Sequence, residues 1–439
     1  MAEVSDIPAA QQPPATSRRA QAAWCLYDWA NQGYPTIIET FIFATFFTQL
    51  VAASEIEGTA QWGYTISLAG IFIVIFSPIL GAIADQGGRR KPWLASFSAV
   101  CMVACALLWF TKPSTDYVLW ALVFFGIGAA SYEFALIFYN AMLGDVAPPG
   151  RLGRLSGWGW ATGYAGGLAL LLLILFLFVQ PQEPLFGLDR EEAEHIRIAA
   201  PIVAVWWLLF GLPLFFFVPD RRGTQVPLRA AIGKGLRQLL DTARNLRRHR
   251  NVARFLLARL FYNDGLNTIF AFGAIYAAGT FGMTFDQIML FGIGLNVTAG
   301  IGAFAFAWIN DIIGSKRTVQ LSLLALMSIG IVLVVLNSLF WFWIFGLLLG
   351  IFFGPVQAAS RALMAELAPK GLEGEMFGLY ALSGKAIAFL GPAVLAFVTA
   401  LFDSQRAGMA SIILFFIVGF AILAGVRDPR VSARGLDPA

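Results

Sequence analysis

Charged residues and histidines are scarce in this 439-residue sequence. Only 13% of the residues are charged, whereas 58% are hydrophobic and the mean hydropathy is +0.72. So few polar side chains cannot cover the surface of a water-soluble fold, and a polytopic membrane protein is predicted. The two histidines, His195 and His249, both fall in predicted loops, which argues against a metal site. We therefore expect no enzyme activity, no metal and no bound cofactor.

Motifs built on cysteine or on a nucleotide-binding loop are also missing. Cys25, Cys101 and Cys105 lie in apolar stretches without CxxC spacing, which predicts packing roles. The P-loop pattern of ATP-driven pumps does not occur. Residues 1 to 22 are polar, lack the apolar run of a signal peptide, and are interpreted as a disordered cytoplasmic tail.

Long apolar runs make up most of the sequence. Twelve runs are long enough to cross a bilayer, with centres at about residues 38, 73, 102, 128, 168, 209, 267, 298, 328, 352, 388 and 416. Lys and Arg are concentrated in the connections on one side of these runs. The positive-inside rule therefore predicts a multi-pass protein of the plasma (inner) membrane with both termini in the cytoplasm.

The longest connection, 220 to 254, separates two sets of six spans. The predicted halves are 23 to 219 and 255 to 427, followed by a cytoplasmic tail at 428 to 439. The connection carries ten basic residues against Asp220 and Asp241, and its apolar residues recur at helical spacing. This pattern predicts a basic amphipathic helix on the anionic inner leaflet. A nucleic-acid site is an alternative, but membrane topology already explains the charge, so no nucleic-acid partner is expected.

Two motifs recur in the two halves and indicate an internal duplication. A charged, glycine-rich loop between spans two and three has a weaker copy 226 residues later, and residues 140 to 157 match 361 to 378. Such repeats predict two related six-helix halves around a central cavity. The loop residues concerned are Gly81, Asp85, Gly88, Arg89 and Arg90 in the first copy, and Asp311, Gly314 and Lys316 in the second.

These motifs resemble those of the major facilitator superfamily of secondary transporters. The superfamily signature between spans two and three, Gly-x-x-x-Asp-x-x-Gly-Arg-Lys/Arg, is matched at 81 to 90, while Ala307 replaces the first glycine in the second copy. Further motifs at 27 to 31, 138 to 141, 157 to 160, 261 to 265 and 380 to 385 are similar to the branch related to the yeast autophagy-associated vacuolar amino-acid effluxer.

The resemblance implies an all-α membrane protein with twelve transmembrane helices in two pseudo-symmetric six-helix halves. It further implies a monomer that moves a small organic solute by alternating access, with amino acids leaving the cytoplasm as the main expectation. A different solute (a sugar, drug or peptide) is an alternative. So is a sensor or scaffold that has the same fold and does not transport.

The charged loop is expected to control the conformation. We expect Asp85 and Arg89 to latch neighbouring helices in the outward-facing state through charge-assisted bonds. The simpler alternative is that Arg89, Arg90 and Lys91 only set topology, but topology requires neither an acid nor glycines. Four further charged residues lie near the cytoplasmic ends and are expected to act as a gate: Asp28, Arg259, Arg361 and Glu366.

Four ionisable residues lie deep in predicted spans, where a charge is costly and thus a functional candidate. They are Glu39, Glu133, Asp264 and Lys385, on spans one, four, seven and eleven. An amino acid requires a cation for its carboxylate and an anion or aromatic face for its ammonium. Glu39 or Glu133 is also a candidate proton-coupling group, and the alternative is that Lys385 merely pairs with one acid and locks the halves. Nearby aromatic candidates are Tyr139, Trp158, Trp160, Tyr262 and Tyr380.

Overall fold

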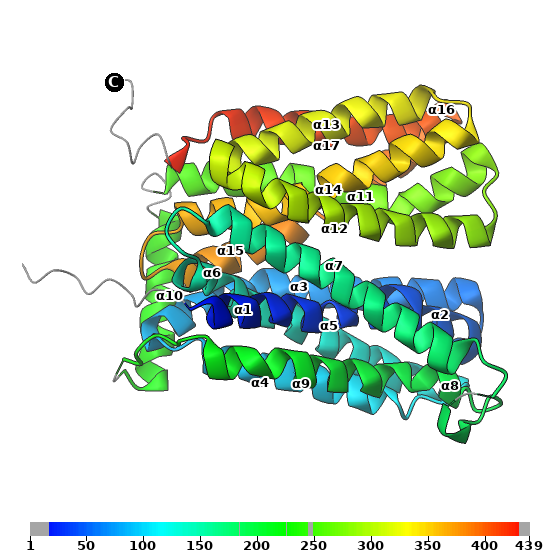
Figure 1. Ribbon diagram of the computed structural model, residues 1–439, viewed down its shortest axis with the longest axis horizontal. Helices are drawn as coiled ribbons and strands as arrows, with labels where there is room; N and C mark the ends of the chain where they lie inside the picture. The colour runs from blue at the N-terminus through cyan, green and yellow to red at the C-terminus, as the bar shows by residue number, and fades with distance from the viewer. Residues whose placement is uncertain (1–16, 184, 225, 245–248, 430–439) are drawn as a thin grey trace, which may run out of the picture.

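The computed structural model describes residues 17–183, 185–224, 226–244 and 249–429. Within these ranges the ordered elements are helices, and no strand occurs among them. The long helices run roughly side by side in two groups, which correspond to the two halves of the sequence (Figure 1). Cys25, Cys101 and Cys105 are buried free thiols, which agrees with the packing role expected of them.

The first half consists of α1 to α9, with two spans interrupted by π-helical stretches. Span one combines α1 (Arg18–Asn31), η1 (Tyr34–Phe41), α2 (Phe43–Phe46) and η2 (Phe47–Val51). The other elements are α3 (Glu55–Gly87), α4 (Lys91–Leu108), η3 (Thr115–Tyr117), α5 (Val118–Ala141), α6 (Leu143–Val146), α7 (Leu152–Ile174), η4 (Leu175–Val179), η5 (Leu185–Gly187), α8 (Glu194–Arg197) and α9 (Ala199–Phe217).

The second half follows the linker helix α10 (Leu228–Arg244) and contains a span that is broken in the middle. Span eleven consists of α15 (Glu373–Lys385) and α16 (Leu390–Phe402), and the break includes the predicted centre near residue 388. The other spans are α11 (Arg250–Phe281), α12 (Phe285–Ile313), α13 (Ser315–Val335), α14 (Leu339–Leu367) and α17 (Gln405–Ala424).

The described helices account for the twelve predicted spans. Eleven segments among the described residues are long and apolar enough to cross a membrane. The twelfth, α11, is 32 residues long, and polar residues such as Asn263 and Asp264 lower its hydropathy. The twelve-helix architecture predicted from the apolar runs is therefore confirmed.

Two predicted boundaries were wrong. Helix α1 begins at Arg18, because the Ser17 hydroxyl accepts a hydrogen bond from the Ala20 N–H at 3.1 Å, so residues 18–22 are helical rather than a disordered tail. Helix α11 begins at Arg250, so the linker is shorter than the predicted 220 to 254. The predicted tails at 1–16 and 430–439 lie outside the described residues.

Helix α10 lies crosswise over one end of the bundle, here called the α10 end (Figure 1). Its small residues Ala231 and Gly235 are buried, and Gly235 packs closely on the backbone of α3 at Ala82. Its larger apolar residues point away from the bundle: Ile232, Leu236 and Leu240 are exposed. The linker thus contains a helix, Leu228–Arg244, and its expected contact with a lipid leaflet stays a prediction.

The two halves meet along two helix pairs, α3 with α15 and α7 with α12. At the first crossing the backbones touch, since a Cβ atom added to Gly81 would overlap the carbonyl of Gly374. The equivalent crossing brings Gly157 against the backbone carbonyl of Ala303. Both crossings lie toward the α10 end of the spans.

Candidate functional site

Two acidic residues cap helices of the opposite half. The Asp85 carboxylate on α3 accepts hydrogen bonds from the backbone N–H groups of Gly374 and Glu375 at 2.9 and 2.8 Å. The Asp311 carboxylate on α12 accepts one from the N–H of Arg154 at 3.0 Å. These N–H groups belong to the first turns of α15 and α7. N–H groups in a first turn have no acceptor inside their own helix, and the start of a helix carries a partial positive charge. In each copy of the loop motif, the acidic residue therefore binds the first turn of a helix in the other half.

The glycines of the loop motif occupy positions where the backbone geometry disfavours a side chain. Gly88 ends α3 with a φ of 75°, and Gly314 ends α12 with a φ of 96°. Residues with a Cβ rarely adopt such conformations. Gly81 permits the close backbone contact described above. Ala307, which replaces the equivalent glycine in the second copy, packs its Cβ against Gly157.

The cation that joins Asp85 is Arg90. Its side chain is only 2% exposed and lies 2.8 Å from Asp145, 3.0 Å from Glu373 and 3.9 Å from Asp85. Arg90 occupies the N-cap position of α4 and turns into the protein, whereas Arg89 is exposed on the loop. In this conformation the contacts across the halves come from Asp85 and Arg90, and the expected latch role of Arg89 stays a prediction.

The start of the linker completes this charge cluster. Arg221 donates hydrogen bonds to Asp145 and Glu373, both at 2.8 Å. Burial alone would lower the pKa of the Arg221 guanidinium, but its bonds to Glu373 and Asp145 outweigh burial and raise it. Asp220 accepts a hydrogen bond from the Arg90 N–H at 3.0 Å and so fixes the start of α4. Asp145 is one of the repeated acids, but nothing in the sequence assigned Arg221 or Glu373 to this cluster.

The second copy of the motif has no equivalent cation cluster at Lys316. The Lys316 ammonium donates to the carbonyl of Ala424 on the α17 side at 3.1 Å. The cation beside Asp311 is instead Arg154, at 3.1 Å. Lys316 was expected in the latch and does not join it, because it sits on the first turn of α13 facing α17.

Two of the four predicted gate residues meet between the halves. Arg361 on α14 lies 2.9 Å from Asp28 on α1, with exposed side-chain fractions of 3% and 11%. Arg361 also donates to the Ser156 hydroxyl of α7 at 2.9 Å. The rings of Trp24 and Trp160 lie 4.8 and 5.6 Å from its guanidinium. Arg361 of the second half is thus surrounded by side chains from α1 and α7 of the first half.

The other two predicted gate residues stay within the second half. Arg259 donates to the Tyr380 carbonyl at 2.7 Å and to the Ser383 hydroxyl at 2.9 Å, and it lies over the Tyr380 ring. Glu366 accepts from the Ser315 hydroxyl at 2.9 Å. Each of these contacts joins helices of the same half, and a gate or snorkelling role for Arg259 and Glu366 stays a prediction.

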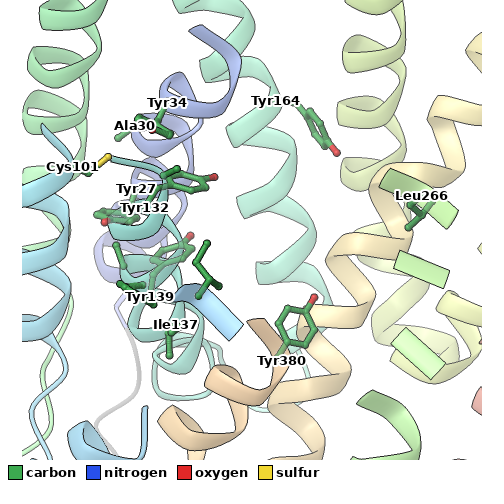
Figure 2. Close-up of a cluster of buried hydrophobic side chains, with 14 of the residues drawn as sticks. Tyr27, Ala30, Tyr34, Cys101, Tyr132, Ile137, Tyr139, Tyr164, Leu266 and Tyr380 are labelled. Carbon is green, nitrogen blue, oxygen red and sulfur yellow. The ribbon is translucent and has the colours of Figure 1, made fainter. Parts of the chain in front are cut away.

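Two of the five predicted aromatic residues, Tyr139 and Trp160, pack beside Arg361. Tyr139 is fully buried and stacks on Trp24 with ring centroids 4.4 Å apart. Figure 2 shows Tyr27, Tyr132 and Tyr139 grouped together, with Tyr380 apart on another helix. The remaining partners are Ser360 for Tyr262, Arg259 for Tyr380, Trp308 for Trp158 and Arg361 for Trp160. Each of these aromatic side chains contacts other protein side chains in this conformation, and substrate contact stays a prediction for them.

The deep charges form a smaller cluster than predicted. Lys385 Nζ on α15 lies 3.0 Å from Glu133 Oε1 on α5, and the exposed side-chain fractions are 32% and 22%. The carboxylate of Glu39 on η1 lies within electrostatic range of both. Lys385 is the last residue of a 13-residue helix and so lies ~18 Å from its start, near the middle of a ~30 Å hydrocarbon layer. Within the described ranges, no three His, Cys, Asp or Glu side chains group into a metal site.

Asp264 does not join this cluster. Its Oδ2 accepts a hydrogen bond from the Gly391 N–H at 2.8 Å, at the start of α16, and the residue is 2% exposed. Asp264 is thus deep, as predicted from its place in span seven, but in this conformation its carboxylate binds the start of the broken helix rather than Lys385 or Glu133.

Sequence relatives agree with these features. The family described as "Vacuole effluxer Atg22 like" matches residues 150–433, and "Major Facilitator Superfamily" matches residues 8–171. An MFS-type transporter of Bacillus subtilis, YxiO, is 28% identical over 93% of this chain and 95% of its own length. Autophagy-related protein 22 of Cryptococcus neoformans is 26% identical over 63% of this chain, which spans about half (53%) of that relative.

Solved structures share the fold. The human organic anion transporter MFSD10 matches 94% of this chain and 100% of its own, at 18% identity and a TM-score of 0.69. FucP, a major facilitator superfamily transporter crystallised in the outward conformation, matches 93% of this chain and 98% of its own, at 16% identity and a TM-score of 0.70. Together with the family match over more than half of the chain, these findings show that it belongs to the Atg22-like family of the major facilitator superfamily of transporters.

Proposed function

We propose that the chain is a secondary active transporter that exports amino acids by alternating access. The observation that carries this proposal is the ion pair between Lys385 and Glu133. It joins the two halves near mid-membrane depth, both side chains remain partly exposed, and Glu39 adds a second carboxylate nearby. Charges at this depth are costly, which favours a functional role over a neutral packing role.

The cluster matches the charges of an amino acid. The Lys385 ammonium is suited to the α-carboxylate of a substrate, and the carboxylates of Glu133 and Glu39 are suited to its α-ammonium. A bound zwitterion would replace the direct contact between Lys385 and Glu133 with contacts to itself. Because the contact between Lys385 and Glu133 links the halves, substrate binding would change the relative stability of the two conformations.

The contacts at the α10 end support a transporter closed on the cytoplasmic side. Arg361 with Asp28, the Arg90 cluster and the two capping acids lie at this end. The basic linker and the start of α1 lie there as well (Figure 1). The positive-inside rule favours a cytoplasmic location for this end and for both termini in the plasma membrane.

The direction and the substrate draw support from the relatives. The matching family is described as "Vacuole effluxer Atg22 like", and the fungal relatives are autophagy-related. That description names efflux out of a vacuole, and export of amino acids across the plasma membrane is our proposal for this chain. We further propose that the protein works as a monomer and that α10 contacts anionic lipids through its exposed basic and apolar residues.

A second candidate function follows from the same ion pair. If Lys385 and Glu133 only lock the halves together, the chain would be a scaffold or sensor with a transporter fold. A different solute (a sugar, drug or peptide) would also leave the fold unchanged, but the paired opposite charges favour a zwitterion.

Counterflow in proteoliposomes tests the proposal. Vesicles containing the purified full chain are loaded with one unlabelled amino acid at a time, and labelled tracer is added outside. We expect accumulation that depends on the loaded amino acid and is lost in Lys385→Ala. Lys316→Ala is the matched control, because Lys316 lies at the α10 end and donates to the backbone carbonyl of Ala424, away from the central ion pair. Absence of counterflow for all amino acids would exclude them as substrates, and counterflow with sugars, drugs or peptides would then identify the solute class.

A further inference from the structure

Span eleven is broken directly beside the central ion pair. Helix α15 ends at Lys385, and α16 begins five residues later at Leu390. Across the break the chain forms tight-turn hydrogen bonds, from Ala388 N–H to the Lys385 carbonyl at 3.2 Å and from Leu390 N–H to the Ile387 carbonyl at 2.8 Å. Movement of the start of α16 relative to α15 would therefore be transmitted to Lys385.

The start of α16 is held by one acidic side chain from span seven. Asp264 Oδ2 accepts the Gly391 N–H at 2.8 Å, and the Thr268 hydroxyl one turn later donates to the Asp264 carbonyl at 2.8 Å. A Cβ atom on Gly391 would overlap Thr268 Oγ1 and would lie 3.2 Å from both carboxylate oxygens. The Asp264 carboxylate and the Thr268 hydroxyl thus both lie against Gly391 at the N-terminus of α16. Asp264 and Thr268 are 2% and 1% exposed.

The second oxygen of this carboxylate, Oδ1, is buried and has no hydrogen-bond partner among the described residues. The negative charge is therefore balanced by the N-terminus of α16 rather than by a cation. The charged groups on the surrounding helices are engaged elsewhere: Arg259 with Tyr380 and Ser383, Lys385 with Glu133, Arg361 with Asp28, Arg406 with Val334 and Asn337, and Asp311 with Arg154.

We propose that Asp264 is a proton-binding site that couples proton movement to the Lys385–Glu133 site. In the conformation described here, the ionised carboxylate holds the N-terminus of α16 through a charge-assisted bond to Gly391 and through the helix dipole. A proton from water that binds Oδ1 neutralises the carboxylate and weakens both interactions. The start of α16 is then free to shift together with the break, which moves Lys385 relative to Glu133.

A proton fits this site better than a metal ion. The three atoms nearest to a Cβ placed on Gly391 are the two Asp264 carboxylate oxygens and the Thr268 hydroxyl. Among the described residues, no three His, Cys, Asp or Glu side chains group into a metal site. Hard cations in proteins are usually bound by about six or more oxygen ligands. An unpartnered, buried carboxylate oxygen needs only one proton. This assignment differs from the expectation that Glu39 or Glu133 carries the coupling proton, and it rests on the proposed function only in using Lys385 as the substrate contact.

Infrared difference spectroscopy of the purified full chain tests proton binding without substrate. We expect one protonated-carboxyl band that appears on acidification and is lost in Asp264→Asn, whose amide oxygen still accepts the Gly391 N–H. Glu39→Gln and Glu133→Gln are the matched controls and should retain this band. In Asp264→Glu the band should persist at a shifted position, which provides the test if Asp264→Asn does not fold. A band that survives in Asp264→Asn, or does not shift in Asp264→Glu, would overturn the proposal.

Transport then tests coupling separately from the substrate. The readout is the ratio of amino-acid accumulation driven by an imposed pH gradient to counterflow without a gradient. We expect this ratio to fall to background in Asp264→Asn and to persist in Asp264→Glu. An unchanged ratio in Asp264→Asn would overturn coupling through this residue. Failure of the wild type to show any amino-acid counterflow would instead contradict the proposed function and leave the infrared result standing.

Discussion

The guanidinium of Arg361 on α14 lies 2.9 Å from the carboxylate of Asp28 on α1, so a single buried ion pair joins span ten to span one. The rings of Trp24 and Trp160 pack against the Arg361 guanidinium at 4.8 and 5.6 Å. An ion pair that bridges the halves and is almost dry stabilises one conformation specifically, because separating the halves leaves two unpaired charges in a poorly solvated place.

Arg361→Ala should destabilise the protein strongly. Removing one partner of a buried ion pair typically costs ~3–5 kcal/mol, because the remaining charge, here Asp28, is left uncompensated. Thermal unfolding of the purified protein measures this loss, and the double variant with Asp28→Asn should recover part of it. Arg317→Ala is the control, since Arg317 is exposed. Equal melting temperatures for Arg361→Ala and Arg317→Ala would contradict the assignment.

Adjacent arginines should differ in their effect on the closed α10 end. Arg90→Ala removes the cation shared by Asp145 and Glu373, whereas Arg89→Ala removes an exposed side chain. A loss of ~1.4 kcal/mol in the closed state would change its ratio to the open state about tenfold. Spin labels at residues 151 and 370, in opposite halves, report the separation. We expect a new long-distance population for Arg90→Ala only; the same population for Arg89→Ala would count against the cluster.

Added salt should weaken the contribution of Arg221 to the closed α10 end more than the contribution of Arg90. The Arg221 side chain is 33% exposed and that of Arg90 is 2% exposed. Partly exposed ion pairs contribute only ~0–1 kcal/mol and are screened at ~1 M salt, whereas buried pairs are screened much less. The same distance measurement should show a small, salt-sensitive opening in Arg221→Ala and a larger, salt-insensitive one in Arg90→Ala. The reverse order would show that the linker rather than α4 supplies the main contact.

The backbone contact at Gly81 gives a prediction with a control on the same helix. In Gly81→Ala the added Cβ would overlap the Gly374 carbonyl, so α3 and α15 must separate. Gly63→Ala adds a Cβ with nothing within 4 Å. We expect Gly81→Ala to open the α10 end and to lower the melting temperature, while Gly63→Ala keeps the wild-type distances. A wild-type distance distribution in Gly81→Ala would rule out close crossing as the reason for this glycine.

Much of the architecture could be predicted because the chain repeats itself. The apolar runs predicted the spans, and the duplicated loop correctly singled out Asp85 and Asp311, together with the glycines that end α3 and α12. The cost of charge inside a membrane likewise singled out Lys385 and Glu133, which form an ion pair.

Pairings between distant or neighbouring residues could not be predicted in the same way. Arg89 and Arg90 are chemically identical neighbours, and only the start of α4 decides which of them turns inward. Asp264 had the depth of a cavity residue, but its partner is a backbone N–H exposed by a break in span eleven. The Gly391-Pro392 dipeptide is the local sequence signal of that break. The spacing of apolar residues alone does not reveal it.

The role of the central pair is tested most directly by exchanging its charges. The double variant Lys385→Glu with Glu133→Lys retains an ion pair between the halves but reverses the positions of the cation and anion offered to a substrate. We expect a melting temperature near that of the wild type, with amino-acid counterflow reduced to background. Counterflow restored to the wild-type level would contradict the account, because it would show that the pair only holds the halves together and that the substrate binds elsewhere.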